Sequence, residues 1–249
     1  EFSLRQLLEA GVHFGHLKKK WNPKMSPYVF MEKNKIHIID LNKTISQLEE
    51  ACRSLKQIAK SGKKILFVAT KKQAKSIVSE LAKSLNMPYI TERWPGGLLT
   101  NFSTIRKSVK KMNSIDSMKD DGTFDTLSKR EKLQIDRTRQ KLELNFGSIE
   151  NMNRIPEAIF VVDINKEHIA VAEANKLGIR SYAMVDTNTN PKLVNFPIPA
   201  NDDSTKSISK IMGIISEAIA EGLSERSKTI EEKAKIKQEK AKEILNKDN

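Results

Sequence analysis

The sequence predicts an α/β fold built on a parallel sheet, and two patterns carry that prediction. Short apolar runs such as KKILFVAT (63–70) and EAIFVVD (157–163) are separated by segments whose apolar residues lie three and four positions apart. The runs are typical of strands buried on both faces, and the spaced segments are typical of amphipathic helices. Alternation of this kind forms right-handed βαβ units, so we expect helices on both faces of the sheet. A third pattern, over residues 103–150, interrupts the alternation and predicts an inserted helical hairpin.

The remaining elements follow in chain order. Ser3 and Gln6 fit a capping box for a short helix over residues 4–10. The segment 11–30 shows no period and predicts an ordered loop, and the overlapping segment 28–40 predicts two short strands around a turn at 32–35. Further strands are predicted at 63–70, 87–93, 157–163, 179–186 and 195–201, and helices at 41–60, 74–82, 168–177 and 208–219. Gly222 is predicted to end the last helix.

The insertion has a narrow apolar seam. Its apolar residues recur every three or four positions in the first half and every seven in the second: Ile105, Val109, Met112, Ile115 and Met118, then Ile135, Leu142 and Ile149. Two long helices packed as an antiparallel hairpin explain this spacing. We therefore divide the chain into three parts. They are an α/β domain with an N-terminal helix and basic loop (1–102 and 151–223), the hairpin (103–150), and a charged C-terminal tail (224–249) that is a solvated helix or disordered.

Composition sets the broad class. The 249 residues, 38% apolar and 30% charged, suit one globular domain with an insertion. No run of about 18 apolar residues occurs, so no membrane span is expected, and the start has no secretory apolar region. The single cysteine, Cys52, fits a reducing compartment. Its helical spacing with Leu48 and Leu55 predicts a buried structural thiol.

Positive charge is concentrated in the N-terminal part of the chain. The formal net charge is +13. Residues 1–111 hold 22 Lys and Arg against 8 Asp and Glu, whereas residues 112–249 hold 22 against 23. A concentrated basic surface attracts polyanions over about 10 Å at 0.1 M salt, and nucleic acid is the usual partner. A merely solubilising lysine-rich surface is the alternative.

Nucleotide-binding motifs are missing from the sequence. A nucleotide-binding α/β enzyme places a glycine-rich turn directly after its first strand, but here ILFVAT is followed by KKQAKS. The pair Gly96–Gly97 comes one strand later, in RWPGGLLTNFSTIRKSVKK (93–111). We expect a positive φ, a close approach to another group, or both at each of these glycines. No cofactor and no small-molecule substrate are predicted.

Two histidines leave a metal site open. His13 and His16 lie three positions apart and could face one ion, with a third ligand from Asp186, Asp202 or Asp203. The alternative is that these imidazoles hydrogen-bond backbone groups in a tight loop. The sequence does not decide between the two, and no metal is assigned.

The segment VDTNTNP (185–191) supplies the alternative function. It follows a predicted strand, where α/β enzymes keep catalytic residues. A cytosolic enzyme that uses Asp186 and Thr187 is therefore the second hypothesis. The sequence places no partner base beside them, and such side chains usually satisfy backbone groups in a turn.

Two segments place cations around a tryptophan. HLKKKWNPK surrounds Trp21 with lysines, and RWPGGLLTNFSTIRKSVKK puts Arg93 beside Trp94 ahead of a cationic helix. An indole can stack on a base while cations hold phosphates, and recognition of folded RNA by shape and phosphate is the expected mode. The alternative is that both tryptophans pin their loops onto the core while the lysines are solvated. The predicted RNA-binding residues are Lys18, Lys19, Lys20, Trp21, Asn22, Lys24, Arg93, Trp94, Gly96, Gly97, Asn101, Arg106, Lys107, Lys110 and Lys111.

A series of motifs resembles the bacterial-type small-subunit ribosomal protein S-two family. They are LLEAGVHFGH, WNPKM, NKIHIIDLNKT, ILFVATKKQA, RWPGGLLTNFSTIR, DGTFDTLSKRE, KLGIRSYAMVDTN and IPANDD, in the family's order over residues 4–203. The departures are small, with Ala69 where the family often has Gly, and Pro95, Arg180 and Asn190 where Leu, Pro and Asp are common.

The resemblance implies a fold and a role. The expected fold is a flavodoxin-like three-layer α/β/α domain with a protruding coiled-coil hairpin. The expected role is structural and without catalysis, on the cytoplasmic small ribosomal subunit. Expected partners are rRNA and neighbouring ribosomal proteins, including the large mRNA-binding protein S-one where present, and no membrane.

Overall fold

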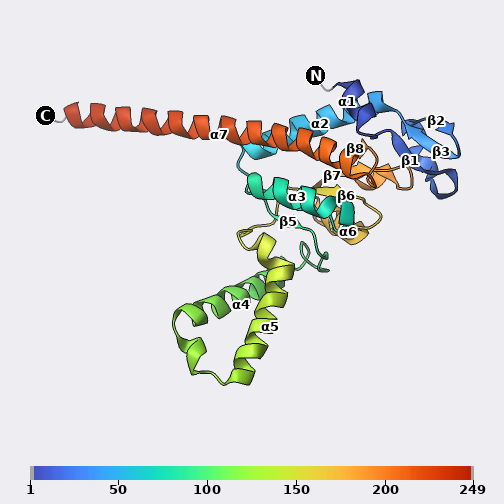
Figure 1. Cartoon of the computed structure of the whole chain (residues 1–249). Coiled ribbons are helices and arrows are strands. Elements are labelled where there is room, and N and C mark those ends of the chain that lie inside the picture. Colours follow the sequence, from blue (N-terminus) through green and yellow to red (C-terminus); the bar gives the residue numbers. More distant parts are fainter. Residues whose placement is uncertain (1–2, 248–249) are drawn as a thin grey trace.

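The computed structural model describes residues 3–247, and its side chains over residues 3–232 apart from position 125. A sheet-containing body carries two projections, a pair of helices and the far end of the C-terminal helix (Figure 1). Among the described residues, no helix combines the length and apolarity needed to cross a bilayer.

Five parallel strands form the central sheet. They are β4 (Ile65–Val68), β5 (Tyr89–Ile90), β6 (Ala158–Val162), β7 (Arg180–Val185) and β8 (Phe196–Pro199). Their order is β5-β4-β6-β7-β8, and every neighbouring pair is parallel. This confirms the α/β prediction, although each strand is shorter than its apolar run.

Helices cover both faces of this sheet. They are α1 (Leu4–Glu9), α2 (Leu41–Lys60), α3 (Lys72–Ser84), α6 (His168–Leu177) and α7 (Thr205–Lys247). Successive strand residues point to opposite faces. Phe67 and Phe160 accordingly join a cluster with residues of α2, α3 and α7, while Leu66 and Val161 join a second cluster with residues of α6. Cys52 lies buried on α2, as predicted, and burial raises the pKa of its thiol to about 12.

A small antiparallel sheet lies in the N-terminal part. Its strands β1 (Phe14–Leu17), β3 (Ile36–Ile39) and β2 (Val29–Lys33) lie in that order. The predicted hairpin corresponds to β2 and β3. The predicted loop 11–30 is only partly correct, because it contains β1 and the 3₁₀ turns η1 (Lys18–Lys20) and η2 (Pro23–Tyr28). The four residues of β1 show no alternation, and pairing with β3 is what makes them a strand.

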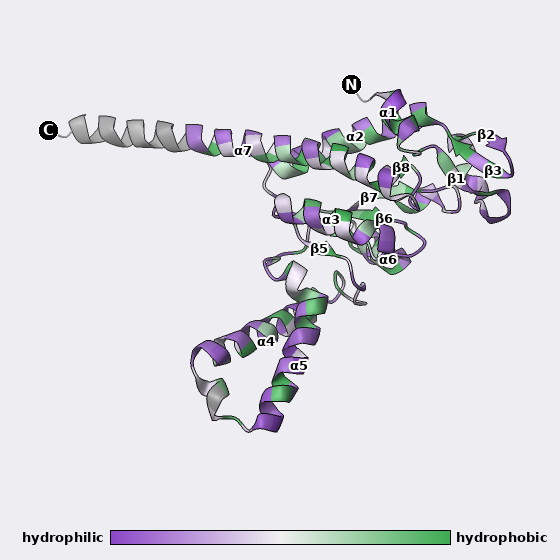
Figure 2. Cartoon of the chain, in the orientation of Figure 1, coloured by the Kyte–Doolittle hydropathy of each residue, from purple (hydrophilic) through white to green (hydrophobic). Residues whose placement is uncertain are grey.

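Two packed helices, α4 (Phe102–Asp120) and α5 (Lys129–Phe146), lie between β5 and β6. The turns η3 (Thr123–Thr126) and η4 (Gly147–Ile149) follow them. The buried apolar seam lies on α4, at Ile105, Val109, Met112 and Ile115, whereas no described residue of α5 is buried. Hydrophilic residues accordingly dominate α5 (Figure 2). A capping box that the sequence analysis missed, Ser128 with Glu131, begins α5.

One predicted helix cap and one predicted helix end are wrong. Ser3 makes no side-chain capping bond, although α1 does begin at Leu4. Gly222 does not end α7, which continues to Lys247, so the predicted tail is helical through 247 and residues 248–249 lie outside the described part. A Cβ at Gly222 would lie 2.4 Å from the carbonyl oxygen of Lys56 on α2. The glycine therefore permits a close approach of two helices.

Candidate nucleic-acid interface

The lysine-rich segment 18–24 lies on the surface. Lys18, Lys19, Lys20 and Lys24 are all exposed. Lys18 is held by Glu32, with 2.7 Å between Nζ and Oε2. The other three have no carboxylate within 4.0 Å among the described residues, although the charge of Lys20 also acts on Asp203 and helps to lower the pKa of that carboxyl. Because none of the three forms an ion pair at that distance, they can approach an outside anion.

Contacts with the rest of the chain fix this segment in place. The Asn22 backbone N–H donates to the carbonyl oxygen of Thr187 at 2.8 Å, and its side chain accepts from the N–H of Lys24 at 3.0 Å. The half-buried Trp21 ring lies 4.8 Å from the ring of buried His37. Part of the indole is therefore engaged inside the chain, and the lysines project from an ordered turn.

The second predicted segment, 93–101, is built differently. Arg93 is exposed, but Trp94 is buried in the cluster that contains Leu98 and Leu99. An indole in this position offers no face to a base, so we remove Trp94 from the predicted RNA-binding set. The alternative, a tryptophan that pins its loop onto the core, describes Trp94 correctly.

The loop closes on a carboxylate of its own chain. Oε1 of Glu173, on α6, accepts from the Gly97 N–H at 2.7 Å and from Trp94 Nε1 at 3.0 Å. Its Oε2 accepts from the N–H groups of Leu99 and Thr100, each at 3.0 Å, and from the Thr100 hydroxyl at 3.1 Å. Burial acts to raise the pKa of Glu173, but these hydrogen bonds outweigh it and hold that pKa below its ordinary value. The amides that could cradle a phosphate are therefore occupied.

The two loop glycines are not equivalent. Gly97 has φ +84°, which confirms the expected left-handed conformation. Gly96 has neither a positive φ nor any neighbour within 4 Å of a Cβ built on it, so the prediction for Gly96 is wrong. Of the two positions, only 97 has a backbone conformation that favours glycine.

The cations of α4 divide into two kinds. Arg106 donates to the carbonyl oxygen of Glu150 at 2.8 Å and to Oδ1 of Asn153 at 2.7 Å, and so joins the two ends of the insertion. Lys107, Lys110 and Lys111 are exposed. Asn101 is exposed as well and accepts from the Thr104 hydroxyl at 2.9 Å.

Met25 of η2 belongs to the same cluster as Leu98, so both predicted segments pack on one face of the sheet.

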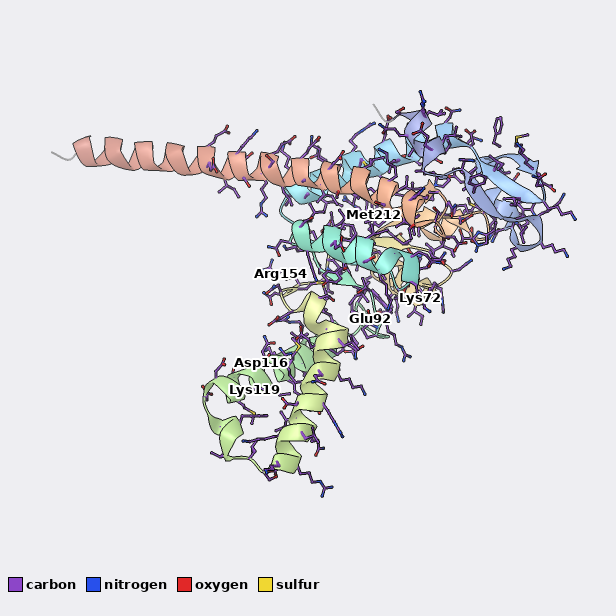
Figure 3. All side chains as sticks on the ribbon, viewed as in Figure 1. Lys72, Glu92, Asp116, Lys119, Arg154 and Met212 are labelled. Atoms are coloured by element: carbon purple, nitrogen blue, oxygen red, sulfur yellow. The ribbon has the colours of Figure 1, made fainter. Side chains whose placement is uncertain are left out.

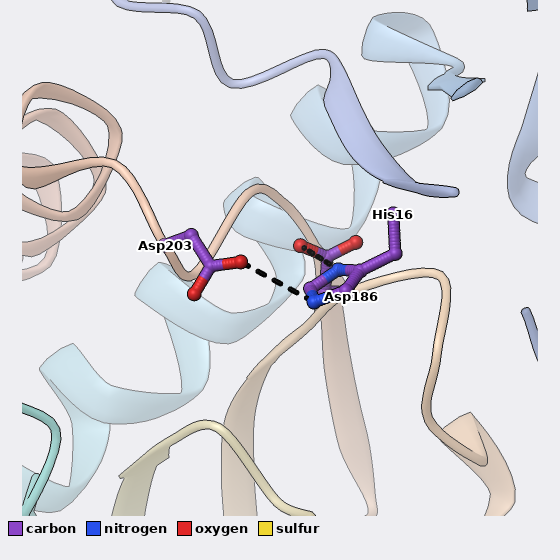
Figure 4. A group of neighbouring side chains, drawn as sticks. All are labelled: His16, Asp186 and Asp203. Atoms are coloured by element: carbon purple, nitrogen blue, oxygen red, sulfur yellow. Dashed lines mark ion pairs between the residues drawn. The ribbon is translucent and has the colours of Figure 1, made fainter. Parts of the chain in front are cut away.

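A group of ionisable side chains gathers at the carboxyl ends of the strands. The His16 Nδ1 atom lies 3.1 Å from Oδ2 of Asp186, and its Nε2 lies 3.2 Å from Oδ2 of Asp203 (Figure 4). The hydrogen bond with Asp186 is the main cause that raises the pKa of His16. One imidazole and two carboxylates this close could hold a divalent cation such as zinc. His13 is not in this group, because its ring lies against Phe14, 4.0 Å between centroids.

Lys71 balances the acids beside His16. Its Nζ lies 2.7 Å from both Asp202 and Asp203 and 3.2 Å from Asp163. Burial acts to lower the pKa of Lys71, but these carboxylates outweigh it and raise that pKa. Burial, with the charges of Asp186 and Asp163, raises the pKa of Asp202, whose Oδ2 is buried without a hydrogen-bond partner. Lys71 therefore neutralises much of this acidic group.

The residues of the enzyme hypothesis have structural partners. The Oδ1 atom of buried Asp186 accepts from the backbone N–H and the hydroxyl of Thr187, at 2.5 and 3.2 Å. The Thr187 hydroxyl oxygen also accepts from the backbone N–H of His16 at 2.8 Å. These bonds tie β1 to the end of β7 and occupy both side chains.

Sequence reasoning missed Glu173 and Lys71. A signal existed for Glu173, because this acid shares a helix face with the buried residues Ala170, Val171 and Ala174. An acid at a core position needs a donor set, and the loop supplies it. Lys71 lies in the loop between β4 and α3 and had no such signal.

Comparisons with known proteins identify the family. Residues 7–222 match the family model described as "Ribosomal protein S2". A small ribosomal subunit protein uS2 of Porphyromonas gingivalis is 66% identical over 224 residues, which are 90% of this chain and 80% of that protein. The uS2 protein of Flavobacterium johnsoniae is 64% identical over 91% of this chain and 89% of its own length. This chain therefore belongs to the ribosomal protein S2 family, whose role in the small ribosomal subunit is structural rather than enzymatic.

Proposed function

We propose that the chain binds small-subunit rRNA through the lysines of segment 18–24. The observation that carries the proposal is that Lys19, Lys20 and Lys24 are exposed, with no carboxylate within 4.0 Å among the described residues, on a turn fixed by Asn22 and Trp21. Ordered cations lose little freedom on meeting a phosphate backbone, and counterion release favours the complex. Lys107, Lys110 and Lys111 on α4 add charge on a second element.

Charge reversal tests the proposal. Changing Lys19, Lys20 and Lys24 to Glu is expected to weaken binding to rRNA, or to subunits that lack this protein, most strongly at low salt. The matched control reverses three exposed lysines elsewhere, Lys176, Lys206 and Lys228. Equal binding by the two variants at low salt contradicts the assignment of segment 18–24.

The pair α4–α5 is proposed to be a coiled-coil docking arm of the α/β domain. It projects from the body (Figure 1), and only its base is shared with the core, since Ile105 and Ile149 belong to the cluster on the sheet. The test is a variant in which a short glycine linker replaces residues 110–144, so that the base of the arm with Ile105 and Ile149 is kept. The expected result is cooperative unfolding of the body with failed incorporation into subunits in sucrose gradients. Loss of cooperative unfolding rejects the division into domain and arm.

A flavodoxin-like three-layer arrangement is proposed for the body. Numbered along the chain, the strand order is 2-1-3-4-5, which is the flavodoxin order, and apolar clusters lie on both faces.

Neighbouring ribosomal proteins, including the large protein S-one where present, are proposed partners in the cytoplasm. Exposed Phe14, Leu17, Phe30 and Met31 on the small sheet, 48–69% accessible, favour a protein contact there. Crosslinks from these positions that reach only rRNA contradict that contact.

A further inference from the structure

A groove runs along the base of the hairpin, where it meets the sheet. It consists of three adjoining cavities of about 530, 50 and 400 Å³. Asn151 lines all three cavities, Asn86 lines the first two, and Lys64 lines the last two. We call it the junction groove. Glu92 in the first cavity and Arg154 in the last mark its ends, below α3 in Figure 3.

The lining carries positive charge that the chain does not compensate. Its cations are Lys63, Lys64, Lys83, Arg93 and Arg154. Its carboxylates are all ion-paired: Glu92 with Lys75 at 2.9 Å, Glu143 with Arg139 at 3.4 Å, and Glu157 with Lys63 at 2.7 Å. Among the described residues, Lys64, Lys83, Arg93 and Arg154 have no carboxylate within 4.0 Å. The groove is therefore built to meet an anion.

Internal contacts hold the groove open in its present shape. Buried Met87 and Met152 are among its lining residues. The Lys64 ammonium donates to the carbonyl oxygen of Asn86 at 2.6 Å, which joins two lining segments. Arg106 binds the segment 150–153 from α4. A ligand would enter a preformed site and would not have to order it.

Amide side chains complete the chemistry. Asn86, Asn145, Asn151 and Asn153 all line the groove. Asn151 is exposed at the centre, with no hydrogen bond from its side chain among the described contacts. An amide offers donors and an acceptor, which suits the edges of unpaired bases.

We infer that the junction groove holds a single strand of RNA, with its phosphates on the cations and a base edge on Asn151. The inference rests on the proposed rRNA-binding function and adds a second surface to it. The two outer cavities, of about 530 and 400 Å³, have the concave form and size of sites that enclose small ligands, which fits an extended strand better than the convex surface of a duplex. The polar lining favours RNA over an apolar peptide.

Photo-crosslinking in assembled subunits tests the inference directly. A photoreactive amino acid replaces Asn151 in one variant and Lys20 in the other, and the full-length chains are incorporated before irradiation. From position 151 we expect a ribonuclease-sensitive adduct that maps to unpaired nucleotides of rRNA. An adduct with a protein, an adduct with a duplex, or no adduct overturns the inference. An RNA adduct from position 20 alone leaves the proposed function intact and rejects only the groove.

Charge reversal provides a quantitative readout. Changing Lys83, Arg93 and Arg154 to Glu removes three cations that have no ion-pair partner among the described residues. Each phosphate contact with single-stranded RNA contributes about 0.7 to the slope of log K for binding against log salt concentration. The magnitude of that slope is therefore expected to be smaller by about 2 in the variant than in the wild type, because three contacts are lost. The Lys176, Lys206 and Lys228 reversal serves again as the control. An unchanged slope in the groove variant overturns the inference.

Discussion

Segment 18–24 keeps its lysines in solvent, whereas the loop 93–101 is closed around a carboxylate from its own chain. Both segments carry a tryptophan among cations, and both pack on the same face of the sheet. In the first, Lys19, Lys20 and Lys24 are exposed and form no ion pair within 4.0 Å among the described residues. In the second, the amides that resemble a phosphate cradle are occupied by Glu173. A donor-rich loop is therefore open to an outside anion only where no carboxylate of the same chain already occupies its donors, as Glu173 does here.

Removing the internal carboxylate is expected to have the largest effect on stability. Glu173→Ala leaves the buried donors of Trp94 and Leu99 without an acceptor, so the free energy of unfolding should fall by about 3 kcal/mol or more. Urea denaturation measures the loss. The control is Glu80→Ala on the exposed face of α3, which should change little. Equal effects at both positions contradict the idea that Glu173 holds the loop.

The loop glycines sharpen the same comparison. Gly97→Val puts a branched side chain at φ +84° and should cost about 1–3 kcal/mol, whereas Gly96→Val should cost within about 0.5 kcal/mol. Thermal unfolding of both variants checks this order.

Calorimetric titration of the wild type with ATP, GTP or NAD should give no heat above dilution. Micromolar binding that Gly97→Val abolishes would show that the loop accepts a nucleotide in spite of Glu173.

Acid is expected to open the loop. The pKa of Glu173 is lowered in the folded chain, so its contribution is fully present above the carboxyl pKa of the unfolded chain. That contribution is lost as the pH falls through the lower folded-state pKa. The gap in unfolding free energy between wild type and Glu173→Gln should therefore be widest near neutral pH and shrink below about pH 4.5. A gap that is constant down to pH 3 contradicts the assignment of charge.

The lysines of segment 18–24 should contribute least to stability. We expect reversal of Lys19, Lys20 and Lys24 to Glu to change the free energy of unfolding by less than about 0.5 kcal/mol, because exposed side chains contribute little to stability. Circular dichroism during urea unfolding measures it. A loss of several kcal/mol would show that these lysines hold the turn, and the RNA-binding defect could then not be assigned to charge.

Local pattern was sufficient for much of the fold. The buried runs that form β4 and β6 are apolar at every position, because both faces of the sheet are covered. The helix α6 follows its spacing and ends at Gly178, whose φ is +66°. These features depend on residues close together in the chain, so their periodicity can be recognised from sequence.

Contacts between distant residues defeated the same reasoning. Gly222 suggested a helix end, but its role is set by the carbonyl of Lys56, which lies in another helix. Strand β1 exists because β3 pairs with it. Neither cause can be found in a local window.

Local sequence was enough to predict the alternation of strands and helices, a helix pair between the second and third strands of the parallel sheet, and the concentration of positive charge in residues 1–111. Those properties are sums or periods over neighbouring residues, and folding does not change them. The burial of Trp94, the exposure of Lys20 and the carboxylate that already binds the Gly97 amide follow only from the three-dimensional fold. The physical reason is that a donor's availability depends on whether an acceptor far along the chain reaches it, and Glu173 is 76 positions away from Gly97.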